Sequence, residues 1–183
     1  MRWEGLFADL EGRLAAEERR DLDDEVAERT RRERALVELD ARLCAATGSS
    51  LRVGLVGGPA LEGELLDVGD GWLLVRAGSA AREVLVPTTA VATLGPLGRE
   101  SEPGRVARRF ALGSALRALS RDRATVGVAL VGGGPLLLGT IDAVGADHLD
   151  LAEHPEGLPR RRENVTAVST VPFAALLSVE SRR

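Results

Sequence analysis

The sequence predicts a mainly β protein with additional helix, in which a charged N-terminal helix precedes two small five-stranded β-barrels joined by a basic helix. Three observations lead to this fold class. The first 47 residues contain strong helix formers and no proline. Short apolar segments separated by glycine-rich turns follow, and one such segment occurs twice. We therefore expect a helical segment, a first barrel, a linker with the basic helix, and a second barrel, at residues 1–47, 48–98, 99–123 and 124–183.

The N-terminal segment is predicted to be a solvated helix. Its central part is dense in charge, with pairs such as Glu25 and Arg29 one helical turn apart. Apolar residues at spacings of three and four gather near its two ends, with Leu36, Leu39 and Leu43 at the second. Because Asp21 is able to cap a new helix, the segment is either one rod or two helices.

The repeated segment covers residues 53–75 and 128–151. With one extra glycine in the first turn of the second copy, Gly63 aligns with Gly139 and Trp72 with His148. The match resumes after a variable loop, where Pro87 aligns with Pro172 and Ala90 with Ala175. Each copy is expected to contain about five short strands, and a glycine at the Gly63 position lets the second strand bend sharply.

Between the copies, the sequence predicts a helix from about Arg105 to Ser120. It carries the most basic part of the chain, and clustered arginines are the usual means of neutralising nucleic-acid phosphates. The alternative is a solvated helix that pairs with the acidic N-terminal helix. The candidate nucleic-acid contacts are Arg105, Arg108, Arg109, Arg117, Arg121 and Arg123.

These motifs carry a resemblance to a known family. The order of elements resembles the Sm-like fold: a helix, a glycine-rich turn before a Leu-x-Gly-x-Leu/Ile strand, and a final Val-Pro-x-x-Ala strand. Residues 53–69 and 128–145 resemble the segment that forms the first strands of that fold. The two-copy arrangement also resembles uncharacterised tandem-repeat proteins of actinobacteria. The resemblance implies small barrels that join edge to edge into rings and a relation to RNA-binding proteins. Another SH3-like barrel is the alternative fold.

The binding residues of the Sm-like family are not transferred to this sequence. Family members use an asparagine in the loop between the second and third strands. Here residues 68–72 and 144–148 occupy that position and contain no asparagine. The resemblance therefore implies a fold and an assembly, but it assigns no uridine-binding residue.

Composition limits the remaining function classes. A net charge of −4 and a pI near 5.4 exclude a protein that covers nucleic acid with its whole surface. Only 3% of residues are aromatic, which disfavours binding by stacked bases. A single cysteine forms no internal disulfide, and neither a signal peptide nor a membrane span is recognisable, so we expect a cytoplasmic protein without a membrane partner.

No residue pattern predicts catalysis, a metal or a cofactor, so we do not expect an enzyme. The glycine turns at 57–58 and 132–134 precede strands rather than helices, which favours hairpins over phosphate cradles. Cys44 is expected to be a buried or half-buried thiol rather than a nucleophile. The residues around the two histidines are expected to form a solvated strand edge and loop rather than a metal site. They are Asp147, His148, Asp150, Glu153 and His154.

Trp72 is the remaining candidate residue, and it either packs in a core or interface or forms an exposed binding platform. The leading hypothesis is a non-enzymatic binding protein in which the arginine-rich helix and the barrel rim contact RNA or DNA phosphates. The alternative is a structural or protein-interaction module that self-associates through barrel edges, while the charged helix recruits a partner.

Overall fold

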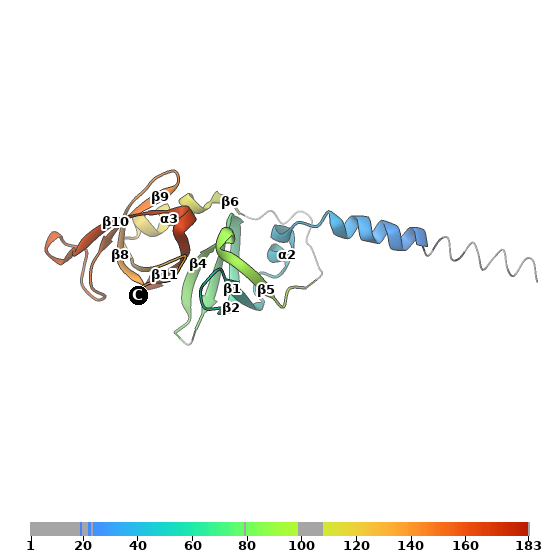
Figure 1. The fold of residues 1–183 in the computed structure, drawn as a ribbon, viewed down its shortest axis with the longest axis horizontal. Coiled ribbons are helices and arrows are strands. Elements are labelled where there is room, and N and C mark those ends of the chain that lie inside the picture. Colours follow the sequence, from blue (N-terminus) through green and yellow to red (C-terminus); the bar gives the residue numbers. More distant parts are fainter. Residues whose placement is uncertain (1–18, 20–21, 23, 79, 99–107, 183) are drawn as a thin grey trace, which may run out of the picture. The chain divides into compact units, whose positions relative to one another are not determined.

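The computed structural model describes residues 19, 22, 24–78, 80–98 and 108–182 (Figure 1). The chain divides into two compact units, Met1–Glu38 and Leu39–Arg183. Each unit is described separately below. None of the described helices is long and apolar enough to cross a membrane.

The first unit contains a solvated helix over residues 24–35. Ion pairs one turn apart run along it, including Arg29 Nε to Glu33 Oε1 at 3.2 Å. Residues 36–38 are not helical, and α2 (Leu39–Ala45) begins after them. The predicted shared face of Leu36, Leu39 and Leu43 is therefore wrong. Leu36 is 81% exposed whereas Leu43 is fully buried, because the helix ends between them.

The described residues of the second unit form eleven strands. The first five are β1 (Ser50–Leu55), β2 (Leu61–Asp70), β3 (Trp72–Ala77), β4 (Arg82–Pro87) and β5 (Val91–Gly95). The remaining six are β6 (Arg108–Ala111), β7 (Thr125–Leu130), β8 (Leu137–Val144), β9 (His148–Glu153), β10 (Ala167–Pro172) and β11 (Leu176–Arg182). The prediction of a mainly β chain with helices is confirmed, and the strands form one sheet that is not closed.

The two halves of the sheet have the same strand order. The first half runs β5-β1-β2-β3-β4 and the second half runs β11-β7-β8-β9-β10. Equivalent hydrogen bonds recur in both: Val56 N–H donates to Ala90 O at 2.9 Å, and Val131 N–H donates to Ala175 O at 2.9 Å. The short turns η1 (Thr88–Ala90) and η3 (Phe173–Ala175) follow the aligned prolines. The sequence repeat is therefore also a repeat of backbone structure.

The two halves join where β4 pairs with β11. This pairing is antiparallel, with Val179 opposite Leu85 and Glu180 opposite Val84. It makes one continuous sheet, in which β5 and β10 are the end strands. In Figure 1, β4 and β11 lie together between the green and red parts of the ribbon. We call this β4–β11 contact the inner junction.

Glycine allows the second strand of each half to pass close to the third. A Cβ atom at Gly63 would lie 2.0 Å from the carbonyl oxygen of Arg76, and one at Gly139 would lie 2.2 Å from that of Ala152. Neither distance is compatible with a side chain. The strand register shifts just after each glycine, between Leu65 and Asp67 in the first half. These glycines are thus required for the close approach of the second strand to the third.

The predicted helix between the copies is correct only in its second part. Residues 108–111 form β6, which pairs in parallel with β2, and α3 (Leu112–Arg121) begins only after it. Strand pairing to β2 supplies hydrogen bonds that outweigh the helical propensity of this short segment. The predicted residues before Arg108 lie outside the described part of the chain.

Candidate functional site

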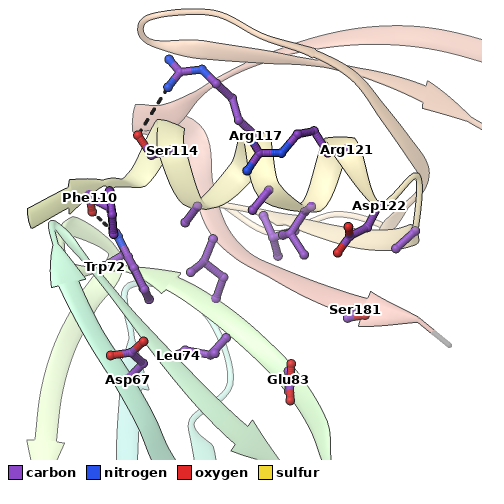
Figure 2. Close-up of a pocket in the computed structure, with 16 residues that line it drawn as sticks. Asp67, Trp72, Leu74, Glu83, Phe110, Ser114, Arg117, Arg121, Asp122 and Ser181 are labelled. Carbon is purple, nitrogen blue, oxygen red and sulfur yellow. Dashed lines mark hydrogen bonds between the residues drawn. The ribbon is translucent and has the colours of Figure 1, made fainter. Parts of the chain in front are cut away.

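A cleft of about 940 Å³ lies at the inner junction (Figure 2). One wall comes from α3 and β11 of the second half, and the other comes from β2, β3 and β4 of the first half. It is lined by Asp67, Trp72, Leu74, Glu83, Leu85, Phe110, Ser114, Ala115, Arg117, Ala118, Leu119, Arg121, Asp122, Ala124, Val179 and Ser181. We call it the inner cleft.

Trp72 fixes one end of the inner cleft. It begins β3, and its indole N–H donates a hydrogen bond of 2.7 Å to the carbonyl oxygen of Phe110 (Figure 2). The side chain is 6% exposed and belongs to the core of the second half. Gly69 provides the space, because a Cβ atom there would lie 2.1 Å from the indole ring. Trp72 therefore packs between the two halves and does not form an exposed binding platform.

Two of the candidate arginines meet in this cleft. Arg117 and Arg121 lie one turn apart on α3 and both line the cleft. Arg117 donates long hydrogen bonds of 3.4 Å to Ser114 Oγ and to Gly145 O. Three carboxylates line the same cleft, so the local charge is mixed rather than strongly basic. They are Asp67, Glu83 and Asp122.

The other candidate arginines are not gathered with these two on one helix. Arg105 lies outside the described residues, and Arg108 and Arg109 belong to β6, with side chains that are also outside them. Arg123 is exposed beyond the end of α3, with φ of 48°. The arginine-rich helix expected from the sequence is therefore wrong as a single element, since the chain changes from strand to helix at residue 112.

A smaller hollow of about 420 Å³ lies at the β5 end of the sheet, beside α2 and β5. Its walls are the structural counterparts of α3 and β11, but among the described residues no second sheet face covers it. Arg42 anchors the chain just after β5, because its guanidinium donates to Leu97 O at 3.0 Å and Gly98 O at 2.9 Å. We call this hollow beside α2 and β5 the outer half-cleft. It is lined by Leu39, Arg42, Leu43, Leu73, Thr88, Val91, Ala92, Thr93, Leu94, Gly95, Pro96 and Leu97.

The exposed end of the second half carries polar residues where the first half has apolar ones. His148, the counterpart of Trp72, bonds through Nδ1 to Asp147 Oδ1 at 2.9 Å, and this hydrogen bond lowers the pKa of Asp147. Thr170 is the counterpart of Leu85, and its hydroxyl donates to Asp150 Oδ1 at 2.6 Å. This face is therefore compatible with water in the isolated chain.

The two histidines of the second half lie in different surroundings. Among the described residues no three His, Cys, Asp or Glu side chains gather around a common point. The expectation of a solvated loop is wrong for His154, which is 2% exposed. Its Nδ1 lies 3.1 Å from Pro155 O and its Nε2 lies 2.9 Å from Thr140 Oγ1. Both ring nitrogens have partners, which is how a histidine is tolerated in a core.

The structure adds features that the sequence did not indicate. Phe110 is 59% exposed and lines the inner cleft, although an apolar residue in a helix of this region would be expected to be buried. Leu85 and Val179 are ordinary apolar strand residues in sequence, yet they meet across the inner junction. Cys44 is buried, as expected.

Comparison with known proteins assigns no family to the chain. No protein-family model matches it, and no curated protein matches it.

Proposed function

We propose that this protein is a non-enzymatic interaction module whose copies assemble through the edges of their β-sheets. In this proposal each half is a small barrel of the Sm-like or SH3-like type, and the tandem chain is a preformed pair of such units. The observation that carries the proposal is the inner junction. Two equivalent halves already join through β4 and β11. This leaves β5, the counterpart of β11, and β10, the counterpart of β4, as the end strands of the sheet.

The composition of the end strands supports pairing. β5 reads VATLG and β10 reads AVSTVP, so neither contains a charged residue. Proteins that must remain monomeric usually protect sheet edges with charges, especially lysine, because unpaired backbone groups recruit other strands. Pro172 ends β10, and Pro96 follows β5. The prolines limit the length of each edge but leave the strands before them able to pair.

Phosphate binding is the competing function, and the inner cleft supports it less well. Arg117 and Arg121 share the cleft with three carboxylates. A nucleic-acid site gains affinity mainly by neutralising phosphates, and nearby carboxylates oppose this. RNA or DNA binding is therefore one of the outcomes that the experiment must be able to detect.

The proposal is tested by light scattering after size exclusion over a range of protein concentrations. Runs at low and high salt, with and without bulk cellular RNA, separate the two functions. We expect a mass above that of one chain that rises with concentration and does not depend on RNA. A single-chain mass at all concentrations overturns the proposal. A shift seen only with RNA at low salt supports phosphate binding instead.

A pair of matched variants locates the contact on the sheet edge. Thr170→Lys places a charge in β10, at the position where the inner junction has Leu85. Thr166→Lys makes the same change just before β10, and each variant loses one hydroxyl hydrogen bond. We expect Thr170→Lys to lower the assembled mass to that of one chain and Thr166→Lys to leave it unchanged. An equal effect of both variants argues against edge pairing.

A further inference from the structure

We propose that the inner cleft is a docking site for a segment of a partner protein that carries an apolar side chain beside a lysine or arginine. The apolar side chain lies on the sheet floor of the cleft, and the basic side chain lies between the carboxylates of its two walls. This inference does not depend on self-association through sheet edges, because every residue that lines the cleft belongs to one chain.

The floor of the cleft is an apolar row that crosses neighbouring strands. In this row Leu74 of β3 lies between Asp67 of β2 and Leu85 of β4. Val179 of β11 lies opposite Leu85 and extends the row across the inner junction. All four residues line the cleft. Leu74 is only half-buried, so apolar surface in the middle of the row is still open to a partner.

Small side chains on α3 keep the space above this row open. Ala115, Ala118 and Asp122 are spaced three and four residues apart, so they lie on one face of the helix, and all line the cleft. Ala118 is exposed, which shows that the helix and the sheet do not close on each other there. Phe110 adds an aromatic ring that is 59% exposed. Burial of such apolar and aromatic surface supplies much of the affinity in protein contacts.

The carboxylates of the cleft favour a basic side chain in the partner. Glu83 extends from the sheet wall and Asp122 from the helix wall (Figure 2). Among the described residues, neither carboxylate has an ion-pair or hydrogen-bond partner. A lysine or arginine placed between the two walls complements both charges, whereas an acidic side chain is repelled there.

The two arginines of the cleft do not oppose this arrangement. Arg117 and Arg121 lie one turn apart on the flank of α3 rather than on the Ala118 face. Arg117 donates hydrogen bonds to Ser114 Oγ and to Gly145 O. Figure 2 shows its side chain directed away from the sheet floor. The positive charge of Arg117 is therefore held at the rim of the cleft.

The openness of the cleft favours a protein segment over a small molecule. Glu83, Ala118 and Asp122 are all exposed, so a ligand bound here keeps one side in water. Small-molecule sites usually bury most of the ligand surface. Peptide segments instead lie along open grooves and insert only some of their side chains. A volume of about 940 Å³ accommodates several such side chains.

Peptide binding to the full chain tests the inference. The probe is the peptide Gly-Ser-Leu-Lys-Leu-Lys-Gly-Ser. Two matched peptides replace both lysines with glutamate or both leucines with serine. NMR shifts of the backbone amides locate the site and give Kd. We expect the probe to shift the amides of Leu74 and Ala118, and to bind about tenfold more tightly than either matched peptide, because each of these lacks one of the two contacts.

Two variants with matched controls show whether the cleft itself binds the probe. Glu83→Lys reverses a cleft charge, and Glu163→Lys makes the same change in the exposed turn η2 (Arg162–Asn164). Ala118→Leu fills the cleft, and Ala60→Leu adds the same side chain in an exposed turn. We expect each cleft variant to weaken binding about tenfold and each control to leave it unchanged. The NMR spectrum of each variant reports whether its fold is kept.

Several results would overturn the inference. They are no binding of the probe at millimolar concentration, equal binding of the three peptides, a preference for the acidic peptide, or equal effects of cleft and control variants. None of them bears on the proposed function, because the assembled mass is measured without peptide. A single-chain mass together with peptide binding in the cleft would overturn only the proposed function.

Discussion

The inner junction and the two free edges are built from equivalent strands, yet their side chains differ. At the inner junction Leu85 and Trp72 are buried between the halves, with relative exposures of 4% and 6%. At the free β10 edge the same positions hold Thr170 and His148, both hydrogen-bonded within their own half. The difference shows how one strand arrangement serves two purposes. Apolar contacts stabilise the inner junction, whereas the polar residues at the β10 edge are compatible with exposure to water.

The strands β11 and β5 also differ, because β11 brings larger side chains to the inner junction than β5 has at the free edge. Leu177 of β11 packs into the core of the first half, and a Cβ atom at Gly58 would lie 2.6 Å from its Cδ2. Its counterpart in β5 is the exposed Ala92. Arg82 and Glu180 also bridge the inner junction at 3.9 Å, and Gly95 replaces Glu180 at the free edge. Contacts between copies are therefore expected to be weaker than the contact within the chain.

The largest effect is expected from truncating the tryptophan of the inner junction. Trp72→Ala should lower the free energy of unfolding by about 3–5 kcal/mol, because it leaves a cavity and removes the partner of Phe110 O. His148→Ala, at the counterpart with a side chain 42% exposed, should cost about 0.5 kcal/mol or less. Urea unfolding of both variants measures the difference. Similar losses would mean that the inner junction and the β10 edge are not distinguished in this way.

The leucine that crosses the inner junction should have the next largest effect. Leu177→Ala is expected to cost about 2–5 kcal/mol, because its side chain is buried in the core of the other half. Leu158→Ala is the matched control, since Leu158 is exposed in a loop of the second half. Thermal or urea unfolding gives the comparison. A loss for Leu177→Ala as small as for the control would contradict a shared core.

A gain of affinity is expected when the free edge is made more like the inner junction. Ala92→Leu restores the side chain found at Leu177 and should tighten self-association about tenfold, because it adds apolar surface to be buried between copies. Sedimentation over a concentration series measures the change in Kd. Ala80→Leu adds the same surface in an exposed loop and should leave Kd unchanged. Equal tightening by both variants would indicate non-specific association.

The smallest effect is expected from the ion pair of the inner junction. Arg82→Ala should cost less than about 1 kcal/mol, because its side chain is substantially exposed and the pair is screened by salt. Arg52→Ala breaks the more exposed pair with Glu62 and should cost no more. Urea unfolding at low and high salt measures both. A loss for Arg82→Ala that is large and independent of salt would show that this pair, rather than apolar packing, holds the halves together.

Several parts of the molecule were predictable from local sequence. The repeat gave the strands of both halves, because glycine turns and apolar spacing report local geometry. The region at 108–111 was predicted as helix and is a strand, since its partner β2 is distant in sequence. His154 was predicted to be solvated and is buried, because Thr140 and the carbonyl of Pro155 satisfy its ring. Both errors concern groups whose partners depend on the tertiary fold.

The sequence by itself determined that the chain is mainly β, that a solvated charged helix precedes the strands, and that one unit occurs twice. These features follow from periodicity, turn residues and internal similarity, all of which act over short stretches of chain. Only the tertiary structure decided that β4 pairs with β11, that Trp72 packs between the halves, and that β5 and β10 remain at the ends of the sheet. Pairing between distant strands depends on which edges and side chains meet in space, and no local pattern specifies that choice.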